Sequence, residues 1–348
     1  MRMMKAAIFE GIENIVVREV PIPVCQEDGI LIKVESCGIC GGDIRNYHNG
    51  LRAGVERQIM GHEIGGIVEE VGSKISKFKI GDRVAIAPDV SCGECYYCRR
   101  GLVNLCVDHR MLGTHWPGGF AQYVYLPSEV LQRGFVELIP ASMSYDEAAI
   151  GEPASSVIAC QEYNNVGLGD VVVIIGDGPI GCLHIEIAKA RGASKTIIVG
   201  KKKLYLAEQF KPDFMISSIN QNPVDEVLKI TDGLGADVVI CANPVTDTQQ
   251  QAVEMVRKRG KVILFGGAPK SKPMTNLNSN TIHYNEITVV GAFSYPAIGL
   301  EQSVRFIHEG KISAKKYISK LVTLEEIPAG IAFAKEGKGL KVVIKPWA

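Results

Sequence analysis

The stretch from Val171 to Ala193, "VVVIIGDGPIGCLHIEIAKARGA", constrains the fold of this chain more than any other. Its opening apolar run predicts a buried strand, and the apolar residues after the glycines recur at helical spacing. Between the two, Gly176, Gly178 and Gly181 have G-x-G-x-x-G spacing. In this strand-turn-helix setting the glycines permit a tight turn and a close approach of pyrophosphate, which the helix N-terminus favours. The stretch therefore predicts the nucleotide-binding turn of a Rossmann fold.

The residues after this turn repeat the same pattern. The apolar runs "TIIVG", "DVVICA", "KVILFGG" and "ITVVGA" follow, several of them separated by helix-length segments. Apolar strands that alternate with helices predict a parallel sheet covered on both faces. Before about residue 150, short alternating runs broken by glycine and proline predict an all-β part instead. A chain of 348 residues also exceeds the size of a single core, so we expect two domains.

Gly200 stands where a Rossmann fold usually has an acidic residue that binds the adenosine ribose. A carboxylate at that position repels the 2′-phosphate of NADP, so glycine removes the repulsion, and Lys201 and Lys202 would add attraction. The lysine run is also typical of the solvated start of a helix. Taken together, the glycine and the lysines favour NADP over NAD.

Four of the ten cysteines form a compact cluster in "CGECYYCRRGLVNLC". Cys92, Cys95, Cys98 and Cys106 have C-x2-C-x2-C-x7-C spacing, which lets several thiolates face one ion and suits a closed tetrahedral structural zinc. Disulfides and an iron site are the alternatives; a reducing cytosol argues against disulfides. Because a closed site has no open position, we assign it no catalytic role.

A second group of metal ligands is spread along the first part of the chain. Cys40 lies in "SCGICGGDIRNYHNG", His62 and Glu63 lie in "MGHEIGGIVEEVG", and Glu152 lies in "GEP". A thiolate, an imidazole and a carboxylate around one open position would make zinc a Lewis acid toward an alcohol or carbonyl oxygen. Taken alone, each of these residues also fits a purely structural role, for example as a thiol in the core or a buried histidine. Asp43 would accept a hydrogen bond from the other ring nitrogen of His62.

The motifs along the chain occur in an order that resembles a known enzyme family. G-I-C-G-x-D is followed by G-H-E-x2-G-x5-G, the four-cysteine segment, "GGFAQYV", "GEP" and G-x-G-x-x-G. Over nearly the whole chain this order resembles the zinc-dependent medium-chain alcohol dehydrogenases, and "GHE" and "GEP" are most similar to their sorbitol (polyol) dehydrogenase branch. The resemblance implies an α/β protein with a Rossmann doubly wound parallel sheet and a GroES-like, mainly-β catalytic domain that carries the structural zinc lobe.

The resemblance also implies how the chain is divided and assembled. The GroES-like domain would cover residues 1–154, with the zinc lobe at about 89–110. The Rossmann domain would cover 155–292, and 293–348 would return to the catalytic domain. Such enzymes resemble one another in pairing through their cofactor domains, which implies a homodimer or homotetramer built on the "ITVVGA" strand.

Carried over by position, Cys40, His62 and Glu63 match the catalytic zinc ligands, and Glu152 matches an acid that binds zinc directly or through water. Ser156 matches a position beside the nicotinamide ring. Phe293 matches an aromatic wall of the substrate pocket, and His115, just before "GGFAQYV", is a second pocket candidate or part of a surface loop. The remaining implied cofactor contacts are Gly176, Gly178, Pro179, Ile180, Gly181, Gly200, Lys201 and Lys202.

The chain departs from the family at the usual proton exit. Two residues after the zinc-binding cysteine, Gly42 replaces a serine or threonine, and three residues further Arg45 replaces a relay histidine. A guanidinium is always charged and cannot act as a general base. Either activity has been lost, or the alcohol proton leaves to water, Glu63 or Glu152, with Arg45 holding an anionic group; we favour the second. Ser294 stands where animal-type enzymes have an arginine for the sugar, which argues against sorbitol itself.

We therefore expect reversible oxidation of a secondary alcohol, in a polyol or sugar-derived substrate, with hydride transfer to NAD(P) and two zinc ions per subunit. The alternatives are a non-catalytic nucleotide- and zinc-binding relative and an NADPH-dependent carbonyl or enone reductase. Equal numbers of basic and acidic residues, 38 each, argue against nucleic acid as a partner. Without an apolar run of about eighteen residues or a signal peptide, we expect no membrane partner and a cytoplasmic location.

Overall fold

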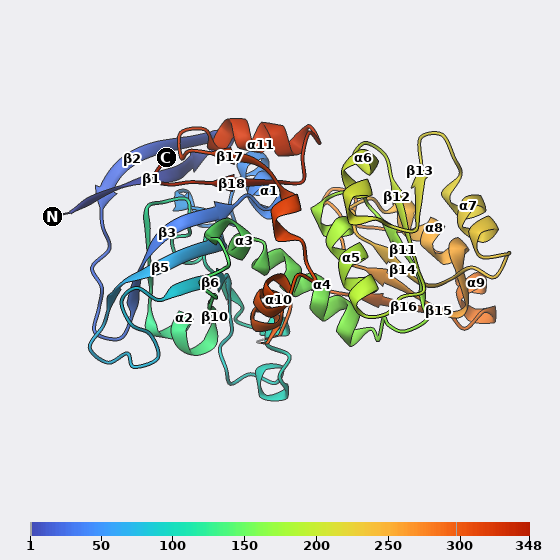
Figure 1. Ribbon diagram of the computed structural model, residues 1–348, viewed down its shortest axis with the longest axis horizontal. Coiled ribbons are helices and arrows are strands. Elements are labelled where there is room, and N and C mark those ends of the chain that lie inside the picture. The colour runs from blue at the N-terminus through green and yellow to red at the C-terminus, as the bar shows by residue number, and fades with distance from the viewer. Residues whose placement is uncertain (1, 297) are drawn as a thin grey trace. The chain divides into compact units, whose positions relative to one another are not determined.

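The computed structural model describes residues 2–296 and 298–348 and divides into two compact units. One unit comprises Met1–Ser155 and Tyr295–Ala348, and the other comprises Ser156–Ser294. Figure 1 shows the helices and strands of both units.

The second unit is built on a six-stranded sheet in the order β13-β12-β11-β14-β15-β16. Every strand pair in it is parallel. This order, 3-2-1-4-5-6 by position in the chain, is that of a doubly wound dinucleotide-binding fold, so the predicted Rossmann sheet is confirmed. The strands are β11 (Val171–Ile175), β12 (Lys195–Gly200), β13 (Phe214–Ser217), β14 (Ala236–Cys241), β15 (Val256–Leu264) and β16 (Thr288–Gly291).

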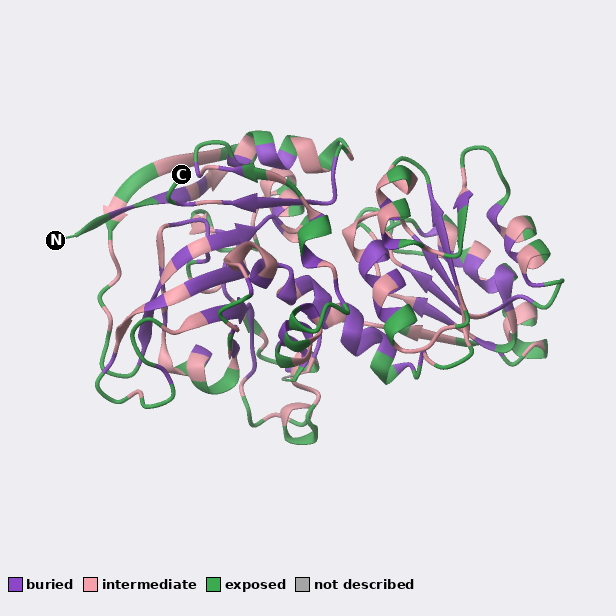
Figure 2. Ribbon diagram, viewed as in Figure 1, coloured by how far each residue is buried: buried purple, intermediate pink, exposed green. Residues whose placement is uncertain are grey.

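Helices cover both faces of this sheet, with α5 and α6 on one side and α7 and α8 on the other (Figure 1). The central strands β11, β12 and β14 are almost entirely buried (Figure 2), as expected for a sheet packed on both faces. The helical segments are α5 (Pro179–Ala190), α6 (Leu204–Ala207), η3 (Glu208–Phe210), α7 (Pro223–Ile230), α8 (Asp247–Met255) and α9 (Ser279–Tyr284).

The turn between β11 and α5 has the geometry that its glycines predict. Gly176 has φ +136°, a conformation that L side chains rarely adopt. A Cβ on Gly181 would lie 1.8 Å from the carbonyl oxygen of Gly176, so only glycine lets α5 approach the strand this closely. Pro179 occupies the first helical position, where its missing N–H costs nothing.

The first unit is mainly β, and its two chain segments share one sheet. Seven strands form the larger sheet: β10-β6-β5-β3-β18-β17 in order, with β9 also paired to β3. Here β18, near the C-terminus, pairs antiparallel with β3, with Ile344 opposite Cys37. These strands are β3 (Ile30–Gly38), β5 (Glu63–Val71), β6 (Arg83–Ala87), β9 (Tyr123–Leu126), β10 (Phe135–Leu138), β17 (Ile318–Val322) and β18 (Lys341–Ile344).

Smaller elements surround this sheet. A three-stranded sheet contains β1 (Met3–Gly11), β2 (Asn14–Pro21) and β4 (Gln58–Ile59), and a two-stranded sheet contains β7 (Asp89–Val90) and β8 (Arg110–Met111). The helical segments are α1 (Gly41–Asn49), η1 (Cys98–Arg100), η2 (Val103–Leu105), α2 (Ser128–Arg133), α3 (Tyr145–Ala149), α4 (Gly151–Tyr163, which continues into the second unit), α10 (Gly299–His308), η4 (Ala314–Tyr317) and α11 (Ile327–Lys335). Within the described residues, no helix has the length and apolarity needed to cross a membrane.

Candidate active site and metal centres

Cys40 caps the N-terminus of α1, directly after strand β3 ends. Its Sγ accepts a hydrogen bond from the Gly42 amide at 3.4 Å. Its own amide donates to the Asp43 carboxylate at 2.9 Å, which completes a reciprocal cap. The helix N-terminus stabilises negative charge, so this position suits a thiolate, the form in which cysteine binds metals.

The pairing of β3 with β5 brings His62 and Glu63 to Cys40. Glu63, the first residue of β5, lies opposite Gly38, and Cys40 follows two residues later. One ligand atom from each of Cys40, His62 and Glu63 lies within 4.8 Å of the others. Three of the four residues that the sequence singled out as catalytic metal ligands therefore form one cluster.

The cluster carries a strongly negative field. Nδ1 of His62 lies 3.7 Å from an oxygen of the nearly buried Asp43, within ion-pair range although longer than a hydrogen bond. Burial acts to lower the pKa of His62, but the negative charges of Asp43 and Cys40 outweigh it and raise this pKa well above its ordinary value. A bound cation would compensate the same field.

Glu63 is fully buried, and its two oxygens have different surroundings. Oε1 accepts a hydrogen bond from the ammonium of Lys341, whereas Oε2 has no partner among the described residues. A Cβ on Gly38 would lie 1.9 Å from Oε2, so only glycine leaves room for this carboxylate. A buried oxygen without a partner, beside a thiolate and an imidazole, fits a divalent cation. The N, O and S donor set is typical of catalytic zinc.

Glu152, in the first turn of α4, is outside the group of atoms within 4.8 Å. Its carboxylate accepts a hydrogen bond from the hydroxyl of Tyr295 at 2.9 Å, and Tyr295 is 2% exposed. Burial raises the pKa of Glu152 to about 7, which the charge of His62 partly offsets. Neither Tyr295 nor Lys341 was predicted from the sequence. "AFSYP" and "LKVVIK" carry no local signal of a contact with an acid far away in the chain.

The proton-exit positions lie beside this cluster. A Cβ added to Gly42 would lie 3.8 Å from Sγ of Cys40 and 3.9 Å from both Nη2 of Arg45 and Cε1 of His62. These are ordinary contact distances, so the space that a serine side chain would use is present. Arg45 itself is exposed at its position on α1 and extends back toward the cluster.

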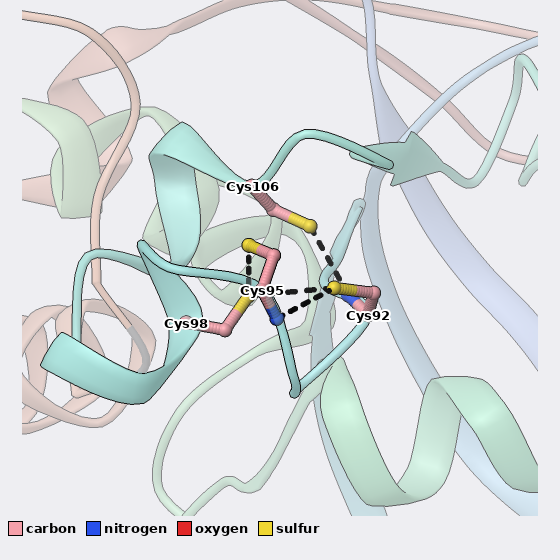
Figure 3. A group of neighbouring side chains, drawn as sticks. All are labelled: Cys92, Cys95, Cys98 and Cys106. Carbon is pink, nitrogen blue, oxygen red and sulfur yellow. Dashed lines mark hydrogen bonds between the residues drawn. The ribbon is translucent and has the colours of Figure 1, made fainter.

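The four cysteines of the lobe lie together in and around η1 and η2 (Figure 3). Sγ of Cys98 is 3.5 Å from Sγ of Cys95 and 3.9 Å from Sγ of Cys92, and Sγ of Cys106 accepts a hydrogen bond from the Cys92 amide at 3.2 Å. Hydrogen bonds from the amides of Cys98 and Val107 lower the pKa of Cys95 to about 6. All ten cysteines are free thiols. The group fits a closed four-thiolate metal site.

His115 lines a cavity of about 340 Å³ together with Arg52, Asp108, Arg110 and Trp116. The loop that carries His115 hydrogen-bonds to the segment between β4 and β5 that contains His62, since the Gly119 amide donates to the Gly61 carbonyl at 2.8 Å. Burial and then the charges of Arg52 and Arg110 lower the pKa of His115. The two arginines and one aspartate of the lining give the cavity a net positive charge, and no residue of the Cys40 cluster lines it.

The second unit contains the remaining predicted positions. Pro179 and Ile180 open α5, and Lys201 and Lys202 are exposed after Gly200 at the end of β12. Gly200 faces the carboxylate of Asp177, a residue of the glycine turn that the sequence analysis did not single out. Phe293 is 63% exposed. Ser156 lies on α4 and is half-buried.

The chain matches known proteins along almost its whole length. Residues 26–134 match the alcohol dehydrogenase GroES-like domain, and residues 179–309 match the zinc-binding dehydrogenase family. The chain is 35% identical to sorbitol dehydrogenase of Bacillus subtilis (strain 168), over 99% of this chain and 97% of that protein. It is 31% identical to D-arabitol-phosphate dehydrogenase of Enterococcus avium, over 96% and 95%.

A solved structure has the same fold. A candidate zinc-binding dehydrogenase from Sinorhizobium meliloti 1021, bound to NADP, superposes with a TM-score of 0.91 at 31% identity. The match covers 99% of this chain and 100% of that one. The predicted fold class, which combines a GroES-like domain with a Rossmann sheet, is confirmed.

Proposed function

The chain belongs to the zinc-dependent medium-chain alcohol dehydrogenases, in their sorbitol (polyol) dehydrogenase branch, and from this premise we propose that it oxidises a secondary alcohol of a polyol or sugar-derived substrate to the ketone, reversibly. Bound NAD(P) would supply the hydride acceptor. The observation that carries the proposal is the convergence of Cys40, His62 and Glu63 in a chain that also has a complete glycine turn.

Two zinc ions per subunit are part of the proposal. Cys40, His62 and Glu63 would hold the catalytic ion, with Glu152 near it, and Cys92, Cys95, Cys98 and Cys106 would hold the structural ion. When bound, the catalytic ion would supply Lewis acidity that lowers the pKa of the substrate hydroxyl. The unpartnered oxygen of Glu63 and the negative field at His62 support a cation at this place.

The protein's own groups orient the acids and take the proton. Tyr295 holds one oxygen of Glu152 and so fixes that carboxylate. Lys341 holds one oxygen of Glu63 and leaves the other available. Because Gly42 carries no hydroxyl, the alcohol proton passes to water or to one of these acids, and Arg45 holds an anionic group of cofactor or substrate.

The glycine turn and the end of β12 would hold the cofactor. Gly176, Gly178 and Gly181 leave room for the pyrophosphate at the start of α5, and Ser156 would contact the nicotinamide. Gly200 with Lys201 and Lys202 supports acceptance of the 2′-phosphate of NADP and a preference for it over NAD. The carboxylate of Asp177, which faces Gly200, opposes that preference.

The cavity around His115, within the first unit, supports a substrate site. We retain Phe293 as a candidate substrate contact by its match to the family position. The two arginines of the cavity favour a second candidate substrate class, a polyol that carries phosphate, because a guanidinium binds phosphate in two-pronged geometry. Arg110 is paired with Asp108, whereas no ion pair of Arg52 is recorded within the described residues. Arg52→Ala should then reduce kcat/KM for a phosphorylated polyol and leave the neutral polyol unchanged.

We propose that the protein is a homodimer or homotetramer located in the cytoplasm. Strand β16 is an edge of the parallel sheet and can pair with a second copy, which suits a homodimer or homotetramer. Free thiols throughout suit a reducing compartment, the cytoplasm.

The test is a panel of neutral and phosphorylated polyols and simple secondary alcohols, each run with NAD and with NADP, comparing kcat/KM. Zinc-loaded protein should oxidise at least one polyol, and Cys40→Ser should abolish that turnover while nucleotide binding remains. No turnover on any substrate would favour the non-catalytic alternative. Activity that survives chelation of the metal, on enones or carbonyls with NADPH, would favour the reductase.

A further inference from the structure

Asp177 occupies the place left open by Gly200. A Cβ built on Gly200 would lie 2.5 Å from both Cβ and Oδ2 of Asp177. Oδ2 accepts two hydrogen bonds from backbone amides that follow β12. The Lys201 amide donates at 2.8 Å and the Lys203 amide at 2.7 Å. The carboxylate thus lies at the end of β12 although it comes from the glycine turn.

In a Rossmann sheet, the end of the second strand is part of the cofactor site. The adenosine ribose lies at the end of the second strand, and an acidic residue there accepts from its 2′-hydroxyl. The same carboxylate disfavours a 2′-phosphate through like charge, while free backbone amides and lysines attract one. Asp177 both adds the negative charge and occupies the two amides that would otherwise face the phosphate.

We propose that Asp177 determines cofactor specificity: it supplies from the glycine turn the ribose-binding carboxylate that β12 lacks, and it opposes binding of the 2′-phosphate. Its second oxygen accepts from the ribose hydroxyl. The exposed Lys201 and Lys202 attract the 2′-phosphate instead. The ratio of NADP to NAD use therefore reflects the balance between these lysines and Asp177. The inference rests on the proposed dinucleotide site.

The test compares Asp177→Asn with the wild-type chain. Asparagine keeps an oxygen that can accept from the amides of Lys201 and Lys203, so the loop is retained and only the charge is lost. Dissociation constants of NADPH and NADH are measured by nucleotide fluorescence, and kcat/KM is measured with both cofactors. Affinity for NADPH relative to NADH should rise about tenfold or more. An unchanged or lower ratio overturns the proposal.

A reciprocal exchange tests the geometry. Gly200→Asp alone would crowd Asp177, because its Cβ has no room there. The double variant Asp177→Gly/Gly200→Asp moves the carboxylate from the turn to the strand end and should return the ratio to the wild-type value or below it. If the double variant keeps the raised ratio of Asp177→Asn, the carboxylate at this place is not the determinant.

Asp232→Asn is the control, since Asp232 is an exposed carboxylate in the loop after α7 and its φ of +51° suits asparagine. Its cofactor ratio should equal that of the wild type. Failure of the proposed function gives a different result from failure of this inference. A chain that binds neither nucleotide has no dinucleotide site, whereas a chain that binds both with a ratio unaffected by Asp177→Asn has the site without this determinant.

Discussion

The ammonium of Lys341 donates to the carboxylate of Glu63 in the interior of the first unit. Their side chains are 6% and 0% exposed, and the ammonium also donates to the Ile39 carbonyl at 3.2 Å. Lys341 is the first residue of β18, which pairs with β3 directly before Cys40. The C-terminal strand therefore places a compensating charge behind the candidate metal cluster.

Removing that ammonium should destabilise the fold strongly. In protein stripped of metal, Lys341→Met leaves the buried carboxylate of Glu63 without a counter-charge, so the free energy of unfolding in urea should fall by about 3 to 5 kcal/mol. Lys345→Met is the matched control, because Lys345 pairs with Asp146 where both side chains are about a quarter exposed, and it should cost about 1 kcal/mol or less. Adding Glu63→Gln to Lys341→Met should recover part of the loss. Equal losses for the two lysines would contradict this account.

Restoring a hydroxyl at position 42 should improve proton transfer. The Cβ of Gly42→Ser fits at 3.8 Å from the Cys40 sulfur, so the new hydroxyl lies beside the candidate ligands. A positioned acid-base group raises turnover, and with Arg45 in place of a relay histidine we expect kcat at pH 7 to rise about tenfold. Gly41→Ser is the control, since a Cβ at Gly41 has no neighbour within 4 Å. If both serines leave kcat unchanged, proton exit does not limit turnover.

Much of the fold was predictable because its signals are local. The five apolar runs from Val171 onward became β11, β12, β14, β15 and β16, and the glycine turn lies where its spacing predicts. The sixth strand, β13, was missed. Phe214 and Met215 are exposed on this short edge strand, so it has neither the continuous apolar run nor the alternation by which strands are recognised.

The partners of the site residues were not predictable in the same way. Cys40, His62 and Glu63 belong to recognisable motifs, whereas Lys341 and Tyr295 reach Glu63 and Glu152 only through the tertiary fold. Asp177 lies inside the glycine motif, at a position whose side chain the motif leaves unspecified. The preference for NADP was predicted from Gly200 on the strand and the lysines after it, without the side chain of Asp177. A neighbouring loop can place an acid in the same space.

Loss of one lobe cysteine should remove one metal ion and leave the other. Cys95→Ser takes a thiolate out of the four-sulfur group, so zinc content by elemental analysis should fall from two ions to one per subunit. Cys25→Ser, which changes a half-buried thiol outside both groups, should retain two. A wild-type content of one ion, unaffected by Cys95→Ser, would contradict the structural zinc assignment.

His184 should make the protein sensitive to acid. Its side chain is fully buried on α5, Nδ1 accepts from the amide of Gln161 at 3.1 Å, and burial lowers its pKa to about 3. In the unfolded chain the pKa is about 6.5, so below that pH the unfolded state binds the extra proton and stability falls as the pH falls. Between pH 7 and pH 5 this one residue should cost about 2 kcal/mol.

The measurement is the change in the free energy of unfolding in urea between pH 7 and pH 5. His184→Asn keeps an acceptor for Gln161 but cannot titrate, so its stability should change by about 2 kcal/mol less than that of the wild type over this interval. His283→Asn removes an exposed histidine and should keep the wild-type pH dependence. Acid also releases metal from all of these variants, which lowers their stability. Comparing them at the same zinc content removes this shared contribution from the difference in unfolding free energy. If His184→Asn loses as much stability as the wild type, the acid sensitivity arises elsewhere in the chain.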